Sequence, residues 1–213
     1  MSRIFVIFGA GELGTELPVI PKDAFIIAAD AGLRYLEHTG IVPDLIVGDF
    51  DSLGSVPTGT HVITHSPEKD DTDMMLAIRE ALARNAEIIV IFGGMGGRPD
   101  HEYANIQALA YIANAGCRAY LIGRGIVCTV IKNSHMDFSD RMRGTLSVFC
   151  HGAKATGVYL RGLKYPLTDH TLTSDYPLGV SNEFTAVPSS VSVREGLLLI
   201  MWEAQNFGIT DFN

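Results

Sequence analysis

The sequence predicts an open, mostly parallel α/β sheet of the Rossmann-like type in residues 1–130, followed by a small all-β sandwich domain in residues 134–213. Two observations predict the first domain. Several segments are apolar on consecutive residues, which is typical of strands buried on both faces of a parallel sheet, and segments of helical periodicity lie between them. The second domain is predicted because the helical periodicity disappears after about Ser134.

The first domain is expected to contain six strands, at 3–8, 24–30, 44–49, 60–66, 87–94 and 118–123. Helices are expected at 71–85 and 100–116, where apolar residues recur every three or four positions, and Gly116 is a typical helix stop. The second domain is expected to contain short strands at 144–152, 153–162, 171–176, 179–187, 190–196 and 197–204. The composition changes at 130–140, which is the expected domain boundary.

Composition excludes several classes of protein. A net charge of −8 argues against a general binder of nucleic acid or of anionic membranes, although a nucleotide substrate stays possible. The three cysteines are far apart and form no C-x-x-C pair, so neither a zinc site nor a disulfide framework is indicated. No apolar segment is long enough to span a membrane, and the N-terminal segment resembles a strand more than a signal peptide. We therefore expect a cytoplasmic protein.

Acidic side chains follow the predicted strands of the first domain. They are Asp30, Asp49, Asp51, Asp70, Asp71, Asp73 and Asp100. Ligands of open α/β sheets bind outside the carboxyl ends of the strands, so these side chains are expected to gather at one edge. Each alone is more readily explained as a turn residue or a helix N-cap than as a functional residue. Together they need a cation, because two like charges 4 Å apart repel by roughly 4 kcal/mol at an effective dielectric of 20. Oxygen ligands without His or Cys indicate Mg²⁺.

A glycine-rich segment at 93–101 supplies groups that bind anions. Backbone N–H groups around Gly96 and Gly97 precede a helix N-terminus, and Arg98 offers a planar fork for phosphate oxygens. The structural alternative is a plain glycine turn with Arg98 paired to a carboxylate. His101 is either a base or phosphate donor, or a histidine bonded to a neighbouring carboxylate at the start of the helix.

Two common nucleotide-binding motifs are not supported by the sequence. Residues 9–14 match G-x-G-x-x-G, with Asp30 about twenty residues further on, but Pro18 and Pro21 leave almost no room for the helix that this motif requires. We interpret this segment as a glycine turn near the site. The Walker pattern is absent from the sequence, which excludes a P-loop enzyme.

Four motifs together resemble the thiamine pyrophosphokinase family over nearly the whole chain and in the same order. They are GDFDS at 48–52, KDDTD at 69–73, GGRPDH at 96–101 and GVSNEF at 179–184. The resemblance implies transfer of the diphosphate of ATP to the hydroxyl of thiamine, with Mg²⁺, by a homodimer. It also implies an α/β catalytic domain and a C-terminal β domain. One position departs from the pattern, because Ala31 stands where a second glycine is common, and this leaves the role of Asp30 open.

The expected site residues form three groups. Asp49, Asp51, Asp73 and Asp100 are expected to be catalytic and to hold the metal. Asp30, Lys69, Asp70, Gly96, Gly97, Arg98, His101 and Asn105 are expected to bind ATP. Ser181 and Asn182 are expected to contact thiamine, and Trp202, the only tryptophan, is a candidate stacking face. The structural alternatives are a turn for Ser181–Asn182 and a core position for Trp202.

Two other functions stay open at this stage. One is a module that senses thiamine or a nucleotide without catalysis, against which the intact acidic set argues. The other is a Mg²⁺-dependent phosphohydrolase, for which the same acidic motifs would serve. The products formed from ATP and thiamine would distinguish all three.

Overall fold

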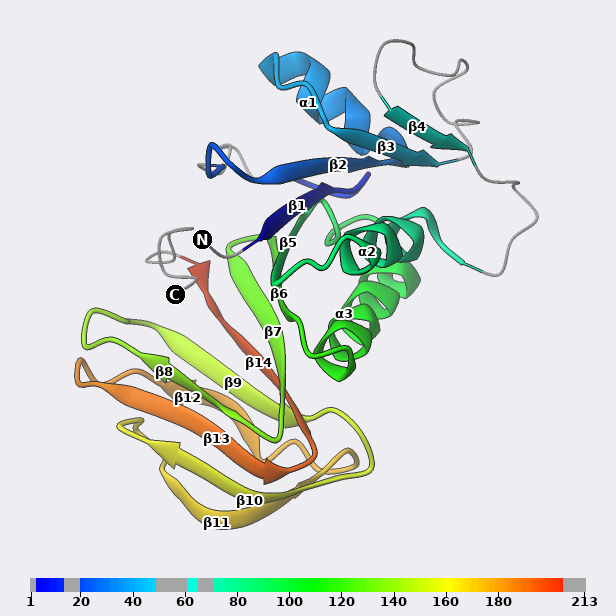
Figure 1. Cartoon of the computed structure of the whole chain (residues 1–213). Helices are drawn as coiled ribbons and strands as arrows, with labels where there is room; N and C mark the ends of the chain where they lie inside the picture. Colours follow the sequence, from blue (N-terminus) through cyan, green and yellow to red (C-terminus); the bar gives the residue numbers. More distant parts are fainter. Residues whose placement is uncertain (1–2, 14–19, 49–60, 65–70, 205–213) are drawn as a thin grey trace.

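The structure is a computed structural model, and it describes residues 3–13, 20–48, 61–64 and 71–204 (Figure 1). Its largest element is a ten-stranded sheet with the strand order β12-β9-β14-β7-β6-β5-β1-β2-β3-β4. The last six strands of this order are parallel to one another. They are β1 (Ile4–Phe8), β2 (Phe25–Ala29), β3 (Leu45–Gly48), β4 (His61–Thr64), β5 (Ile88–Phe92) and β6 (Arg118–Gly123). The prediction of a mostly parallel α/β sheet is confirmed.

Helices cover both faces of this parallel part. On one face α2 (Asp73–Ala83) and α3 (Pro99–Asn114) pack on alternate residues of the strands, and on the other face α1 (Leu33–Thr39) contributes Leu33 and Leu36 to the core. Because both faces are covered, these strands are apolar on consecutive residues. β5, for example, is buried over its whole length.

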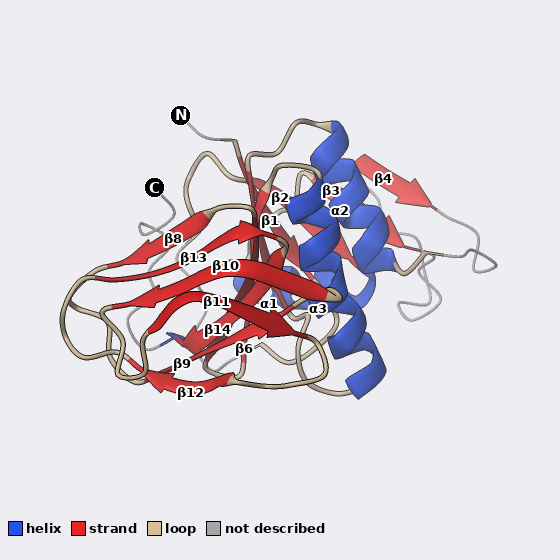
Figure 2. Ribbon diagram, turned by 90° about the horizontal axis from the view of Figure 1, so that it is seen from below, coloured by secondary structure: helices blue, strands red, loops and turns tan. Residues whose placement is uncertain are grey.

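The antiparallel part of the chain forms the β sandwich. Four antiparallel strands complete the large sheet: β7 (Ile126–Lys132), β9 (Thr145–Cys150), β12 (Gly179–Glu183) and β14 (Leu197–Glu203). A second sheet has the order β11-β10-β13-β8 and is antiparallel throughout. Its strands are β8 (His135–Phe138), β10 (Lys154–Arg161), β11 (Leu167–Thr173) and β13 (Ser189–Glu195). Figure 2 shows β8, β10, β12 and β13 on one side of the molecule and α2 and α3 on the other.

Three elements were not predicted from the sequence. α1 is only seven residues long and lies in a segment where no helical repeat can be recognised. β7 was not identified as a strand, and β8 lies inside the segment 130–140 that was interpreted as a boundary. The large sheet continues from β6 into β7, and β7 itself crosses residue 130, so the boundaries 1–130 and 134–213 stay a prediction. Within the described ranges, none of the helices is long and apolar enough to cross a membrane.

Candidate active site

A pocket of about 430 Å³ lies at the carboxyl ends of the parallel strands. Its lining comes from β1, β2, β5 and the starts of α2 and α3. The lining residues are Gly9, Ala10, Gly11, Ala29, Asp30, Thr72, Asp73, Met74, Gly93, Gly94, Gly96, Gly97, Arg98, His101 and Asn105. Twelve residues are expected at the metal and ATP sites, and seven of them line this pocket. These seven are Asp30, Asp73, Gly96, Gly97, Arg98, His101 and Asn105.

Two glycine segments form the floor of the pocket. The N–H of Gly9 donates to Phe92 O (2.8 Å), and that of Gly11 donates to Gly93 O (2.7 Å). Gly93 has a φ of +63°, and a Cβ there would lie 2.3 Å from the carbonyl oxygen of Gly9. Only glycine therefore allows the two segments to approach this closely. The interpretation of residues 9–14 as a glycine turn near the site agrees with the described part of this segment.

Side chains from neighbouring helices hold the glycine segments in place. Asn105 Nδ2 donates to Gly94 O (2.8 Å), and the Glu102 carboxylate accepts from the N–H of Gly96 (3.1 Å). From the opposite side of the sheet, the hydroxyl of Tyr35 donates to Gly11 O (2.7 Å). α3 and α1 thus fix the backbone that surrounds the pocket.

Arg98 lines the pocket with a largely exposed side chain and is paired with Asp100. Its Nε and Nη2 contact the two carboxylate oxygens of Asp100 at 3.2 and 2.5 Å. This hydrogen bonding raises the pKa of Arg98 and lowers the pKa of Asp100 from their usual values. The structural alternative considered for Arg98, pairing with a carboxylate, is the arrangement observed. Asp100 itself does not line the pocket, and its predicted role at the metal stays a prediction.

Asp73 lines the pocket from the first turn of α2. The residue that caps this helix is Thr72, whose hydroxyl accepts from the N–H of Met75 (3.2 Å). Asp71 points elsewhere, because it pairs with Arg79 at 2.6 Å. Thr72, and not Asp73, is therefore the N-cap residue of α2, whereas Asp73 lies in the first turn, where a carboxylate is also favourable for the helix.

Asp30 begins a short 3-10 turn, Asp30–Gly32, directly after β2. Its φ is 45°, a left-handed conformation that Asp tolerates better than most residues. Gly48, the last residue of β3, lies against it, since a Cβ on Gly48 would be 3.2 Å from Asp30 Cα. The start of the GDFDS motif is therefore adjacent to Asp30.

Four expected site residues, Asp49, Asp51, Lys69 and Asp70, lie outside the described residues. Among the described residues, no group of three His, Cys, Asp or Glu side chains is arranged to hold a metal ion. The predicted metal set of Asp49, Asp51, Asp73 and Asp100 stays a prediction.

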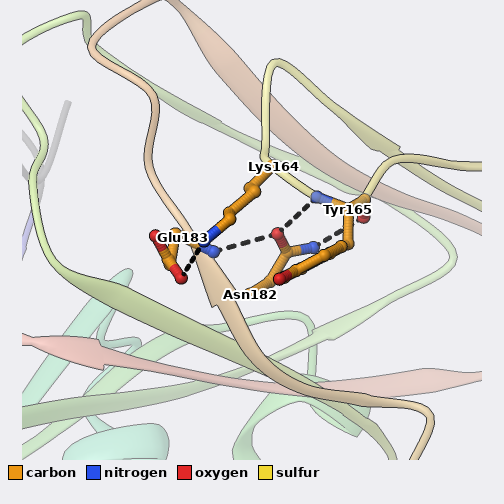
Figure 3. A network of polar contacts seen from close by, with 4 residues as sticks. All are labelled: Lys164, Tyr165, Asn182 and Glu183. Carbon is orange, nitrogen blue, oxygen red and sulfur yellow. Dashed lines mark hydrogen bonds and ion pairs between the residues drawn. The ribbon is translucent and has the colours of Figure 1, made fainter.

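The residues expected to contact thiamine lie on a different part of the molecule. Ser181 is exposed on β12, whereas Asn182 is buried and its side chain binds the backbone of Tyr165 (Figure 3). Trp202 is 1% exposed and packs edge-on against Phe138 in the core, as its structural alternative supposed. In this position the indole ring has no face open to a ligand.

Sequence reasoning missed several residues of the site. The sequence placed the glycine turn of residues 9–11 near the site but did not assign Gly9, Ala10 or Gly11 to it, and it passed over Thr72 and Met74. Tyr35 and Glu102 hold the loops, but nothing in their sequence context distinguishes them from other residues on a helix surface. A signal for the glycine turn was available, because a parallel sheet allows β1 and β5 to be neighbours. The glycines that follow these two strands would then lie side by side.

The comparisons with known proteins agree with one family. The thiamin pyrophosphokinase catalytic domain matches residues 18–121, and the thiamin pyrophosphokinase vitamin B1 binding domain matches residues 131–198. The thiamine pyrophosphokinase of Bacillus subtilis is 30% identical over 184 residues, which cover 82% of this chain and 85% of the relative. Thiamin pyrophosphokinase 1 of Caenorhabditis elegans is 26% identical over 195 residues, which cover 84% of this chain and 78% of the relative.

A solved structure supports the same assignment. The crystal structure of the Bacillus subtilis thiamine pyrophosphokinase superposes with a TM-score of 0.83 at 27% identity, covering 94% of this chain and 99% of that one. The resemblance inferred from the four motifs is thereby confirmed. The chain belongs to the thiamine pyrophosphokinase family.

Proposed function

We propose that the glycine-lined pocket binds the triphosphate of ATP together with Mg²⁺, and that the chain transfers the β,γ-diphosphate to the hydroxyl of thiamine with release of AMP. Synthesis of thiamine diphosphate from ATP follows from the family to which the chain belongs. One observation supports the location: the two glycine segments, Arg98 and two carboxylates, Asp30 and Asp73, line a single pocket.

The phosphate groups are proposed to bind at the start of α3. The N–H of Gly96 is already used by Glu102, so Gly97 is the better candidate for a phosphate contact. The N-terminus of the 16-residue helix α3 lies at the pocket, and the positive end of its dipole also favours an anion there. His101, in the first turn of α3, is proposed to donate to a phosphate oxygen.

Arg98 is proposed to exchange one partner for another when ATP binds. Its planar fork fits a carboxylate and a phosphate equally well, and it is now engaged by Asp100. The side chain of Arg98 is 72% exposed, so the pair is stabilised little and can be replaced at low cost. Asp100 would then be released toward the metal site.

The donor set of the pocket fits Mg²⁺. Asp73 supplies a carboxylate at the pocket wall, and we propose that Asp49, Asp51 and Asp100 complete the set. When bound, Mg²⁺ neutralises charge on the triphosphate oxygens. One of these aspartates is proposed to accept the proton of the thiamine hydroxyl. The hydroxyl oxygen of thiamine then bonds to the β-phosphorus of ATP, and the bond from that phosphorus to the oxygen that leaves with AMP breaks.

An assay of products tests this function. The protein is incubated with ATP, Mg²⁺ and thiamine, and nucleotides and thiamine esters are separated by chromatography. We expect equal amounts of AMP and thiamine diphosphate, and neither in excess EDTA. Formation of ADP as the nucleotide product, or undiminished turnover in EDTA, would contradict the proposal.

The protein is also proposed to be a homodimer in which two subunits share each site. Among the residues that the structure describes, none beyond Asn105 lines the pocket, and β12 lies away from α2, among the antiparallel strands, in both views (Figures 1 and 2). A partner related by a two-fold axis would bring its β12 to the pocket. Co-refolding Asp73→Asn with Asn182→Ala protein should give mixed dimers more active than either parent at low thiamine. Verified mixed dimers without any recovery would show that each subunit works alone.

A further inference from the structure

The side-chain amide of Asn182 is almost completely occupied by hydrogen bonds inside the protein. Its Oδ1 accepts from the N–H of Tyr165 and from the N–H of Glu183, both at 2.9 Å, and its Nδ2 donates to Tyr165 O at 2.7 Å (Figure 3). An amide has two acceptor lone pairs and two N–H donors, so one N–H is left. Asn182 is also only 2% exposed. It is therefore poorly placed to contact a ligand directly.

The amide continues a pairing of two backbone segments. Leu163 pairs with Phe184 in an isolated bridge, and the N–H of Lys164 donates to Glu183 O at 3.0 Å. At the next position the side-chain amide of Asn182 takes the place of a peptide group. It binds both the backbone N–H and the backbone carbonyl of Tyr165. It does so where the backbone of β12 becomes irregular, because Ser181 has a φ of 57°. The segment 163–165 is thus fixed to β12 up to Tyr165.

Tyr165 is the aromatic side chain that this arrangement presents to solvent. It is 57% exposed, whereas Trp202 is 1% exposed. Lys164 and Glu183 beside it form an ion pair of 2.6 Å, and the Lys164 ammonium lies 5.4 Å from the centroid of the Tyr165 ring. The ring is therefore an exposed flat face beside β12, whose backbone is fixed by Asn182 and whose neighbours Lys164 and Glu183 neutralise each other.

We infer that Asn182 is a positioning residue for thiamine, which acts through Tyr165 and does not itself contact the substrate. This inference rests on the proposed function, in which the region of Ser181 binds thiamine. A ring whose backbone is already fixed loses less conformational freedom when a flat ligand packs on it. Asn182 accordingly determines the affinity for thiamine and leaves the affinity for ATP unchanged.

A double-mutant cycle tests the inference. The KM values for thiamine and ATP and the kcat are measured for the wild type, Asn182→Ala, Tyr165→Ala and the double variant. We expect Asn182→Ala to raise the thiamine KM by about tenfold, the upper range for immobilising one side chain, with the ATP KM and kcat unchanged. Tyr165→Ala should raise the thiamine KM at least as much. The double variant should match Tyr165→Ala alone.

Control variants separate this role from general stability. Asn133 makes a comparable bond, because its Oδ1 accepts from the N–H of Gly196 at 2.8 Å, and Asn133→Ala should leave the thiamine KM unchanged. If Asn182→Ala does not fold, Asn182→Ser replaces it in the cycle, since serine keeps a polar side chain and adds no charge at this buried position.

Three results would overturn the inference while leaving the proposed function intact. The first is a thiamine KM of the double variant that is raised by the product of the two single factors, which would mean that Asn182 and Tyr165 act independently. The second is an equal rise in the ATP KM, which would indicate a general structural defect. The third is an unchanged thiamine KM in a folded Asn182 variant. A wild-type protein that makes no thiamine diphosphate would instead refute the proposed function.

Discussion

Arg98 and Asp100 are bound to each other through two hydrogen bonds, of 3.2 and 2.5 Å, beside the glycine-lined pocket. The pair joins the residue that precedes α3 to the first turn of that helix. A phosphate would meet the same guanidinium fork that the carboxylate now occupies. A phosphate at this place would therefore compete with Asp100 for the Arg98 guanidinium.

Replacing Arg98 by Lys is expected to impair the use of ATP. Lysine keeps the positive charge but cannot form two parallel hydrogen bonds. We expect the kcat/KM for ATP to fall by at least about tenfold, which corresponds to the loss of one charged hydrogen bond of about 1.5–3 kcal/mol, with a much smaller change in the thiamine KM. Steady-state kinetics with each substrate varied in turn measure both.

The matched control for this change is Arg79→Lys. Arg79 also pairs with an aspartate, Asp71, at 2.6 Å, but neither residue lines the pocket. Its kinetics should equal those of the wild type. Equal effects of the two substitutions, or wild-type kinetics for Arg98→Lys, would show that Arg98 does not bind phosphate.

Asp73→Asn is expected to lower turnover by at least ~10²-fold while the fold is kept, since removal of one group that stabilises the transition state commonly costs about 2.7–4 kcal/mol. Stability should change little because Thr72, not Asp73, caps α2. Asp71→Asn serves as the control and should lose at most a weak surface ion pair. Thermal unfolding and turnover are measured on both. A large drop in melting temperature for Asp73→Asn, with normal activity in the protein that remains folded, would assign Asp73 a structural role.

The contact between the two glycine segments predicts a difference between two glycine substitutions. Gly93→Ala and Gly116→Ala both place an alanine at a positive φ, of +63° and +79°. Left-handed backbone alone costs roughly 1–2 kcal/mol, which is the expected loss for Gly116, where a Cβ meets open space. At Gly93 the Cβ would also lie 2.3 Å from Gly9 O, so a larger loss of stability and weaker ATP binding are expected. Chemical denaturation of the two variants compares them, and equal losses would argue against the close contact.

Burial lowers the pKa of His151 from its usual value near 6.5. The unfolded chain therefore takes up a proton at a higher pH than the folded chain does. The contribution of His151 to stability is complete above about pH 6.5 and is lost as the pH falls through that value toward the folded pKa. The free energy of unfolding of the wild type should fall more steeply between pH 7 and 5.5 than that of His151→Asn. Identical slopes for the two proteins would contradict this.

Sequence reasoning predicted the parallel sheet well because strands buried on both faces leave a continuous apolar signal, as in β5. It missed α1, which is too short for a recognisable repeat, and β8, half of whose residues are exposed. The position of the pocket could be anticipated because parallel strands end at one edge of the sheet. For Trp202 a core position was one of two alternatives, between which the sequence could not decide, and the hydrogen bonds of Asn182 could not be anticipated, since both depend on contacts between residues that are distant in the sequence.

Equilibrium binding of a non-hydrolysable ATP analogue, with a methylene group between the α- and β-phosphorus atoms, tests the location of the ATP site most directly. Titration calorimetry in the presence of Mg²⁺ would compare the wild type, Arg98→Lys and Asn182→Ala. If the glycine-lined pocket binds ATP and the region around Tyr165 binds thiamine, Arg98→Lys should weaken binding of the analogue by about tenfold or more, and Asn182→Ala should bind it as the wild type does. Wild-type affinity in Arg98→Lys together with weakened affinity in Asn182→Ala would place the nucleotide on the β sandwich and contradict the account.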